Sequence, residues 1–371
     1  MARKWWGLVA GGVVVGAAVT AGALRTGRDD PAIDADATAR FAVAGDLGRA
    51  GVFPGRSWEK VARPADAGWS EEKLDAAWQY AQQIGSGTIL IVQHGVVVAA
   101  WGDVTEPYNV FSIRKSLLHA LIGLLVESGA LDLDATLADL GVDDTDGLTP
   151  AERGARVRDL LTSRSGVYHP AAYEARDNAS RRPARGSHRP GEFFYYNNWD
   201  FNALGTIYER DAKGRLFEDF EAHVAAPLEM KDFSLDRTEY VRERQSAHPA
   251  YLFHMTARDL ARFGLLYLRN GRWRDRQIVP EAWIEASTQR YVKDAQPFSD
   301  YGYLWWIYPE WSGHLYSASG KGNQKVLVWP GRDMVVVHLA TTKTWGLFGS
   351  EVGSVDFWKL MSRIAAAAPQ P

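Results

Sequence analysis

Three serine residues are each followed three positions later by a lysine: Ser57–Lys60, Ser70–Lys73 and Ser112–Lys115. On a helix, residues at this spacing lie on the same face, so the lysine amine can reach the serine hydroxyl. If burial keeps the amine neutral, it can take the serine proton and make the hydroxyl a nucleophile towards an ester or amide carbonyl. Because the spacing occurs three times, it does not by itself identify the reactive pair. The sequence around each serine has to be compared.

Ser112 differs from the other two serines in the segment that follows it. Ser57 lies in a stretch rich in Asp, Ala, Gly and Pro, and Ser70 is expected to be an exposed helix cap. After Ser112, apolar residues lie nearly all round the predicted helix, which indicates burial. Burial would lower the pKa of Lys115, and the helix N-terminus would favour a developing oxyanion. The alternative is that Ser112 only caps the helix while Lys115 extends to solvent.

A second group of chemically useful residues lies in the segment Pro190–Asn198. A phenol and an amide two residues apart at a loop–helix junction can supply a general acid or base and a group that holds a substrate carbonyl. Two such pairs overlap here, Tyr195/Asn197 and Tyr196/Asn198, and spacing alone does not choose between them. The alternative is an aromatic plug of the core followed by an asparagine cap.

Together these residues resemble the serine β-lactamase and penicillin-binding-protein superfamily, especially its class C and esterase-like branch. The resemblance covers about residues 58–364. It implies that Ser112 and Lys115 are catalytic, and its Pro-Gly-x-x-Phe-x-Tyr-x-Asn pattern selects Tyr196 as the third catalytic residue and Asn198 as a substrate-binding residue. Two further segments are similar to family sequences and occur in the same order: Leu160–Gly166 and Thr256–Ala261.

The family's third motif, a strand with Lys-Thr-Gly or His-x-Gly, corresponds to Ala318-Ser319-Gly320-Lys321. Ala318 replaces the basic residue, which in the family helps to organise the site and to engage a substrate carboxylate. We therefore expect poor turnover of β-lactams relative to neutral esters, unless Lys321 or Lys325 compensates. Strand alternation argues against Lys321, because an odd offset from Ala318 turns its side chain to the opposite face.

The resemblance also implies a substrate-binding role for Ser319, Gly320 and Lys321. The backbone N–H groups of Ser112 and Lys321 would form the oxyanion hole. The chemistry requires no metal or organic cofactor. The sequence contains neither the Gly-x-Ser-x-Gly elbow of α/β-hydrolases nor a His-Glu-x-x-His metal pattern.

Other chemically capable residues have ordinary structural interpretations. His119 lies on the same helical face as Ser112, and a hydrogen-bonded core histidine is the favoured interpretation. Five arginines precede Tyr196, where a solvated loop is favoured over an anion-attracting rim. Four aromatic residues precede the third motif and are expected partly to wall the site and partly to face the core. The arginines are Arg176, Arg181, Arg182, Arg185 and Arg189, and the aromatic residues are Tyr301, Tyr303, Trp305 and Trp306.

The elements that must position these groups are strands at both ends of the chain and helices between them. Two hairpins are predicted, Thr88–Gln93 with Val96–Trp101 and Lys325–Trp329 with Met334–Ala340. Helices are predicted from Ser70, over Ser116–Ser128, Val157–Leu161, Ala203–Tyr208 and Ala257–Leu268, and over about 354–365. This order predicts an α/β (α+β) fold of the β-lactamase/transpeptidase-like type. Its antiparallel sheet is built from both chain ends with flanking helices, and a mainly helical subdomain is inserted.

The N-terminus has the features of an export signal. Basic residues flank an uncharged stretch, Trp5–Leu24, and about 20 apolar residues suffice to span a bilayer. Residues 1–25 are therefore expected to be a signal peptide or a signal anchor, which places the rest of the chain in the periplasm or outside the cell. As an anchor, residues 5–24 would tether it to the membrane. Residues 26–57 are expected to be a linker, and 58–371 the serine hydrolase domain.

The composition is that of a globular protein without cysteine: 371 residues, 46% hydrophobic and 23% charged. A net charge of −3 gives no reason to expect a nucleic-acid partner. The expected activity is two-step acyl transfer from a small-molecule or peptide-like ester or amide, as in an esterase, amidase or peptidase. Lys115 and Tyr196 share the proton transfers, and the sequence does not decide which of them is the base in each step. The alternative, favoured by Ala318, is a non-catalytic penicillin-sensing or cell-wall-binding module of the same fold. The sequence does not indicate an oligomeric state.

Overall fold

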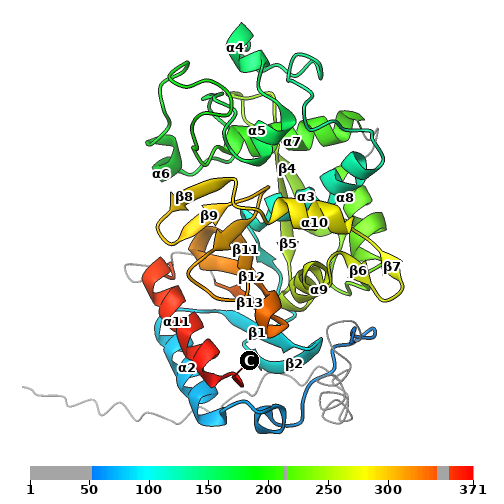
Figure 1. The fold of residues 1–371 in the computed structure, drawn as a ribbon, viewed down its shortest axis with the longest axis vertical. Helices are drawn as coiled ribbons and strands as arrows, with labels where there is room; N and C mark the ends of the chain where they lie inside the picture. The colour runs from blue at the N-terminus through cyan, green and yellow to red at the C-terminus, as the bar shows by residue number, and fades with distance from the viewer. Residues whose placement is uncertain (1–51, 212–214, 341–350, 371) are drawn as a thin grey trace, which may run out of the picture.

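One eight-stranded antiparallel sheet forms the centre of the molecule (Figure 1). The computed structural model describes residues 52–211, 215–340 and 351–370. The strand order is β2-β1-β13-β12-β11-β10-β9-β8, so the first hairpin joins the last one edge to edge. The strands are β1 Thr88–Gln93, β2 Val96–Trp101, β8 Val292–Gln296, β9 Ser299–Tyr301, β10 Trp306–Tyr308, β11 Leu315–Gly320, β12 Gln324–Trp329 and β13 Met334–Leu339.

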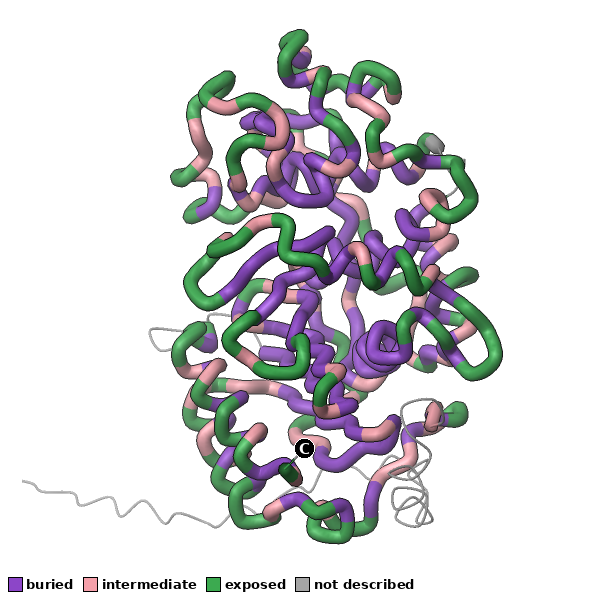
Figure 2. Tube along the Cα trace, viewed as in Figure 1, coloured by how far each residue is buried: buried purple, intermediate pink, exposed green. Residues whose placement is uncertain are grey.

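Helices cover both faces of the sheet. On one face, α2 (Glu71–Gln83) lies beside α11 (Ser354–Ala367), and the ring of Phe357 packs on His338 of β13. On the other face, α9 (Ala257–Leu268) packs on β12 and β13, where a Cβ at Gly264 would overlap Val335. Alternate residues of β12 and β13 therefore face α11 or α9. The sheet and these helices share a buried core (Figure 2).

A mainly helical part occupies the upper half of Figure 1. It is joined to the sheet through α3 (Ile113–Glu127), whose residues up to Gly123 are buried. The other helices are α4 Pro150–Arg153, α5 Val157–Leu161, α6 Arg176–Ala179, α7 Asn198–Asp211, α8 Leu216–Phe220 and α10 Glu281–Ser287. A small sheet contains β3 Tyr108–Asn109, β5 Ala250–Met255 and β4 Thr238–Val241, and β6 Arg272–Trp273 pairs with β7 Arg276–Gln277.

The predicted fold class is confirmed, and most predicted elements lie where the sequence patterns placed them. The predicted bounds of α5 and α9 agree with the structure, as do both strands of the first hairpin. Helix α7 begins earlier than predicted, at Asn198 rather than Ala203. Its first turns contain the buried polar residues Asp200 and Asn202, which hide the apolar periodicity.

The predicted export signal lies outside the described residues. Of the predicted linker, only residues 52–57 are described, and they contact the domain: Arg274 donates to the carbonyl of Pro54 at 3.1 Å and Arg262 to that of Gly55 at 2.7 Å. Within the described ranges, no helix has both the length and the apolar character that crossing a bilayer requires.

Candidate active site

The end of β11 lies against the chain segment that leads into α3. A Cβ at Gly320 would lie 2.5 Å from the carbonyl oxygen of Val110, so only glycine permits this approach. On its other side, the N–H of Val110 donates to the carbonyl of Phe253 on β5 at 3.1 Å. The residues before Ser112 are therefore held between two strands.

A tight turn sets the position of Ser112. Phe111 has φ 46°, in the left-handed region that non-glycine residues rarely adopt. The side-chain oxygen of Asn109 accepts a hydrogen bond from the Phe111 N–H at 2.9 Å, and Gln324 donates to the Asn109 carbonyl at 2.9 Å. Ser112 stands at the N-cap of α3, but its hydroxyl makes no capping hydrogen bond. The interpretation of Ser112 as a simple helix cap is therefore wrong.

Lys115 lies at the centre of the candidate site. Its Nζ lies within hydrogen-bond distance of three groups: Ser112 Oγ at 2.7 Å, Tyr196 Oη at 2.9 Å and Asn198 Oδ1 at 2.9 Å. The residue is 1% exposed, so it does not extend to solvent. Burial holds the pKa of Lys115 well below 10.5, and the nearby charge of Arg114 lowers it further. A neutral amine in this position can accept a proton from the Ser112 hydroxyl.

The structure distinguishes the two overlapping tyrosine–asparagine pairs. Tyr196 Oη reaches Lys115, and Asn198 is the first residue of α7 with its amide oxygen on the same amine. Tyr195 Oη instead donates to the carbonyl of Asn178 at 2.9 Å, and Asn197 bonds to the carbonyl of Val167. Only the pair Tyr196/Asn198 converges on Lys115.

The protonation state of Tyr196 follows from its surroundings. Burial raises the pKa of Tyr196 to about 12, although a hydrogen bond with Ser112 and the charge of Arg114 act in the opposite direction. The phenol therefore carries its proton at neutral pH. The aromatic rings of Phe201 and Trp306 pack against it at 4.9 and 5.4 Å between centroids.

The segment 160–166 holds the Tyr196 loop in place. Ser163 Oγ donates to the carbonyl of Tyr195 at 2.7 Å and accepts from the N–H of Asn197 at 2.8 Å. Asp200 accepts hydrogen bonds from Ser165 and from Asn197. Burial raises the pKa of Asp200 well above its usual value, more than these hydrogen bonds lower it.

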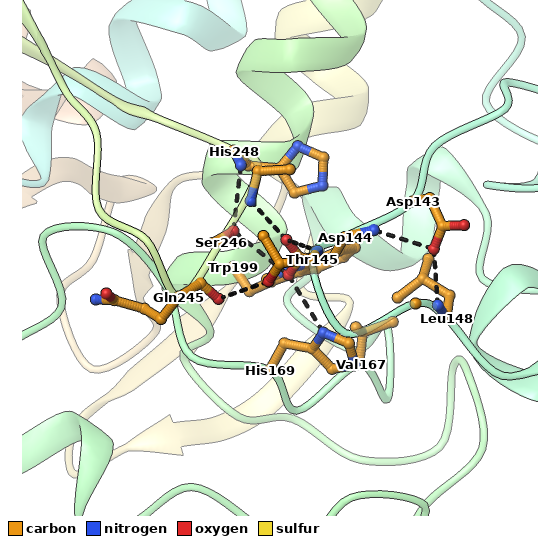
Figure 3. Close-up of polar contacts among 12 residues, drawn as sticks. Asp143, Asp144, Thr145, Leu148, Val167, His169, Trp199, Gln245, Ser246 and His248 are labelled. Atoms are coloured by element: carbon orange, nitrogen blue, oxygen red, sulfur yellow. Dashed lines mark hydrogen bonds and ion pairs between the residues drawn. The ribbon is translucent and has the colours of Figure 1, made fainter.

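A buried network around Asp144 fixes the start of α7 (Figure 3). Its carboxylate accepts from Trp199 Nε1 at 2.6 Å, from the Ala247 N–H at 2.6 Å and from His169 Nδ1 at 3.2 Å. Burial alone would raise the pKa of Asp144, but these and the Thr145 hydrogen bond together hold it well below its usual value. Trp199 directly follows Asn198, so the ionised carboxylate anchors the helix turn that presents Asn198. No local sequence pattern marks this network, because its members lie far apart in the chain.

The third motif has a buried and a partly exposed part. Ala318 is fully buried, whereas Ser319 and Gly320 are partly exposed. Lys321 is exposed and its ammonium pairs with Glu351 at 3.0 Å. Lys325 is buried and donates to Ser319 Oγ at 2.7 Å. Of the two lysines that could compensate for Ala318, the structure thus places Lys325 against the motif.

His119 and the arginine-rich loop have structural roles. His119 is fully buried, and its ring nitrogens bond to Tyr267 and Ser287. Burial lowers its pKa to about 3, so it is a neutral core histidine, as expected. Three of the five loop arginines form ion pairs with carboxylates, which favours a solvated loop over an anion-attracting rim. The ion pairs are Arg181–Asp177, Arg182–Glu174 and Arg185–Glu152.

The four aromatic residues before the third motif partly wall the site and partly face the core, as predicted, but the division follows the cross-strand pairing of Trp306 with Tyr301 rather than strand alternation. Trp306 and Tyr301 pack around Tyr196, with ring centroids 5.4 and 6.1 Å away. Trp305 instead packs on Tyr267 in the core at 4.5 Å, and Tyr303 stacks on Tyr291. In the part of the chain that the structure describes, no group of three or more His, Asp or Glu side chains is arranged to hold a metal ion.

The sequence matches the Beta-lactamase family over residues 58–351. Protein flp of Staphylococcus aureus (strain MW2) is 24% identical over 198 residues, which are 46% of this chain and 39% of that protein. The chain therefore aligns with about two fifths of that relative's length.

Similar solved structures share the fold. An octameric penicillin-binding protein homologue from Pyrococcus abyssi superposes with a TM-score of 0.59 and 21% identity, covering 80% of this chain and 78% of that one. A penicillin-binding protein from Bacillus halodurans gives 0.58 and 18% identity, covering 78% and 99%. EstCE1, described as a hydrolase with promiscuous acyltransferase activity, gives 0.55 and 18% identity, covering 80% and 98%.

Proposed function

The chain belongs to the Beta-lactamase family, and from this premise we propose that it is a serine hydrolase that forms an acyl-enzyme with small-molecule or peptide-like esters or amides. One observation carries the proposal: the buried Lys115 amine contacts the hydroxyls of Ser112 and Tyr196 at once. A serine that only capped α3, or a lysine that only packed against the core, would not require this arrangement.

The first half of the proposed reaction forms the acyl-enzyme. Neutral Lys115 takes the proton of the Ser112 hydroxyl while Oγ attacks the carbonyl carbon, which gives a tetrahedral oxyanion. The protonated amine is hydrogen-bonded to Tyr196, so the proton passes through this phenol to the leaving alcohol or amine. The bond to the leaving group then breaks, and the acyl group remains as an ester of Ser112.

The second half of the reaction hydrolyses the acyl-enzyme and releases the acid. The same groups transfer protons, in the opposite direction. A water molecule loses a proton to the Lys115–Tyr196 pair and attacks the acyl carbonyl, and Ser112 leaves with the proton returned to its Oγ. Because burial raises the pKa of Tyr196 to about 12, the phenol relays protons rather than acting as a standing phenolate. Asn198 orients the amine through its Oδ1 and lies beside the substrate carbonyl.

Backbone groups supply the proposed oxyanion hole. Gly320 packs on Val110, which brings the chain at Lys321 close to the first residues of α3. The N–H groups of Ser112 and Lys321 would then donate to the oxyanion at the N-terminus of a helix, where negative charge is stabilised.

A non-catalytic binding module is the second candidate, and its supporting observation is the loss of the basic residue at Ala318. The two candidates differ in turnover. Incubation with 4-nitrophenyl butyrate should release nitrophenol continuously, and mass spectrometry of acid-quenched protein should find the acyl group on Ser112. Stoichiometric acylation of Ser112 without turnover would support the binding module. If neither turnover nor acylation were detected, the hydrolase proposal would be overturned.

We also propose that residues 1–25 direct the protein out of the cytoplasm. The support is the uncharged Trp5–Leu24 segment with its basic flanks. Cell fractionation of the full chain should find the hydrolase domain in the periplasmic, membrane or extracellular fraction. Deletion of residues 2–25 should retain it in the cytoplasm.

A further inference from the structure

Arg114 is a buried cation that directly precedes Lys115 on α3. It is 2% exposed, and its guanidinium lies over the ring of Tyr251 on β5, 4.4 Å from the ring centroid. Its Nη2 donates to Oδ1 of Asn202 at 2.7 Å. The Asn202 amide is fixed in this orientation, because its Nδ2 donates to the carbonyl of Ala172 at 3.0 Å. The guanidinium is therefore held in one place next to the catalytic lysine.

Arg114 and Lys115 bind the same helix one turn apart. Lys115 contacts the amide of Asn198, and Arg114 contacts that of Asn202, four residues later on α7. Residues at this spacing lie on one face of a helix. Consecutive bases of α3 thus meet consecutive turns of α7, which brings the guanidinium and the amine to neighbouring positions in the interior.

Among the described residues, no carboxylate pairs with the Arg114 guanidinium. Its Nη2 binds only an amide, and its Nη1 has no hydrogen-bond partner there. Nearby acids are engaged elsewhere: Glu174, in the loop before α6, pairs with Arg182, and Asp200 of α7 accepts from Ser165. A second positive charge next to this guanidinium would be repelled without a negative charge to compensate it.

The two neighbouring bases differ in how readily they lose a proton. An arginine side chain keeps its charge at every pH that a protein survives, whereas a buried lysine can become neutral. The repulsion is therefore relieved at Lys115. Burial lowers the pKa of Lys115 most, the charge of Arg114 lowers it further, and the charge of Glu174 raises it.

We propose that Arg114 is a positioning residue of the hydrolase, whose fixed and uncompensated positive charge keeps the Lys115 amine free of its proton before the reaction. Arg114 does not touch the substrate and acts only through Lys115. This role rests on the proposed function, in which neutral Lys115 takes the proton of Ser112. Glu174 acts in the opposite direction, so the two charges together set how much of the base is available.

Other titratable groups on the elements around α3 do not account for a difference between variants, because the variants leave them unchanged. Tyr196 and Tyr251 face the two bases, and burial raises the pKa of each to about 12. Burial raises the pKa of Asp200 well above its usual value, and its carboxyl bonds to Ser165. The rest face or bond elsewhere: His254 lies on the opposite face of β5 from Tyr251, Asp219 of α8 accepts from Tyr208, Glu218 of α8 pairs with Arg215, Tyr316 of β11 donates to the Tyr267 carbonyl, and Lys325 of β12 faces α11.

The test follows the pH dependence of kcat/KM for 4-nitrophenyl butyrate, a neutral ester. Arg114→Met removes the charge but keeps an unbranched side chain. The rising limb, where Lys115 loses its proton, should move to higher pH by about one unit or more, since a nearby charge shifts a pKa by roughly 1–3 units. At a pH below both limbs, kcat/KM should fall at least about tenfold, and the loss should shrink as the pH rises above both limbs.

Two further variants test the charge without removing Arg114. Asn202→Asp adds a carboxylate at the atom that Arg114 binds, so the limb should again move to higher pH. Glu174→Gln keeps the shape of the side chain but removes the charge that opposes Arg114, so the limb should move to lower pH. Circular dichroism of each variant confirms that the fold is retained. The opposite directions of these shifts would not arise from a general loss of structure.

The outcomes separate this role from a structural one. If the limb stays at the wild-type pH in Arg114→Met and Asn202→Asp while the rate falls equally at every pH, Arg114 only supports the fold and the inference is overturned. A shift in the same direction in all three variants would also overturn it. Neither result affects the hydrolase proposal, which rests on wild-type turnover. Absence of turnover by the wild-type protein would overturn both.

Discussion

Lys115 and Asn198 lie 83 residues apart in the chain, yet Nζ of the lysine donates to Oδ1 of the asparagine at 2.9 Å inside the protein. This hydrogen bond joins the first turn of α3 to the first turn of α7. The sheet-associated helix and the helical part therefore meet at the amine that also contacts Ser112. We therefore expect substitutions of the residues around this amine to alter the proposed reaction.

Ser112→Ala should abolish ester turnover, because it removes the only one of the three Ser-x-x-Lys hydroxyls that Lys115 reaches. Ser70→Ala is a matched control, since Ser70 caps α2 by accepting from the Lys73 N–H at 3.4 Å. Ser57→Ala is a second control, since Ser57 accepts from Lys231. Rates with 4-nitrophenyl butyrate check all three variants, and full activity in Ser112→Ala would show that the nucleophile is misassigned.

Tyr196→Phe removes one hydroxyl and should lower kcat by about 10²–10⁴-fold, the usual contribution of a general acid or base. Tyr195→Phe is the control because Tyr195 Oη bonds to Asn178 instead of Lys115, so we expect a much smaller loss of rate. Stopped-flow kinetics would separate acylation from deacylation. A larger loss in Tyr195→Phe than in Tyr196→Phe would reverse the assignment.

The pH dependence of kcat/KM should show a rising limb set by Lys115. A lysine acts as a base only when neutral, and its neutral fraction increases with pH through its pKa. Because burial lowers the pKa of Lys115 well below 10.5, the limb should lie well below pH 10.5. Tyr196, with a pKa of about 12, should cause no fall in rate before strongly alkaline pH. A rising limb near pH 10.5 for a neutral ester would contradict a buried neutral amine.

Gly320→Ala should impair activity without abolishing folding. The new Cβ would lie 2.5 Å from the Val110 carbonyl, so β11 or the segment before Ser112 must shift. The expected result is a fall in kcat of at least about tenfold, since misplacement by about 1 Å costs on the order of 10²-fold in rate. Gly55→Ala is the control, because a Cβ there meets no atom within 4 Å. Near-normal kcat in Gly320→Ala would mean that the close approach does not position the nucleophile.

Lys325→Met should raise the melting temperature, because it removes a buried charge. The expected gain in melting temperature is larger at low pH than at high pH. The lysine titrates near 10.5 when unfolded and near 7 when folded, so between these values the unfolded chain binds more protons. The destabilisation that Lys325 causes in the wild-type protein therefore decreases as pH rises across this window, and it is greatest below about pH 7. The difference in Tm between variant and wild type, measured by differential scanning calorimetry, should be largest at pH 7 and below and should shrink towards pH 10.

The sequence predicted the helices and strands whose hydrophobic periodicity is visible within one short segment. The period-2 strands around His94-Gly95 and the helical spacing of Ala257–Leu268 identify β1, β2 and α9 without tertiary information. The short strands β9 and β10 carry no comparable signal, because they consist of three residues each in an aromatic-rich segment.

The candidate site was predictable in its residues but not in its contacts. Local spacing placed Ser112 beside Lys115, and the family resemblance selected Tyr196, but the spacing of the two tyrosine–asparagine pairs could not show that the Tyr195 hydroxyl bonds to Asn178 instead. The contact between Lys325 and Ser319 depends on the register of β11 against β12, which residue patterns alone do not fix. These contacts depend on tertiary packing, which the motifs alone do not specify.

The pairing of Thr88 with Leu339 has a consequence for biosynthesis. The hairpin β1–β2 is made early, but β1 cannot gain its second neighbour until almost the whole domain has left the ribosome. Until then, β1 exposes an unpaired apolar edge of the kind that associates with other chains. Pairing of residues so distant in sequence also makes folding slow. Newly made chains should therefore depend on a holding chaperone, and truncation before β13 should yield aggregates rather than a smaller folded domain.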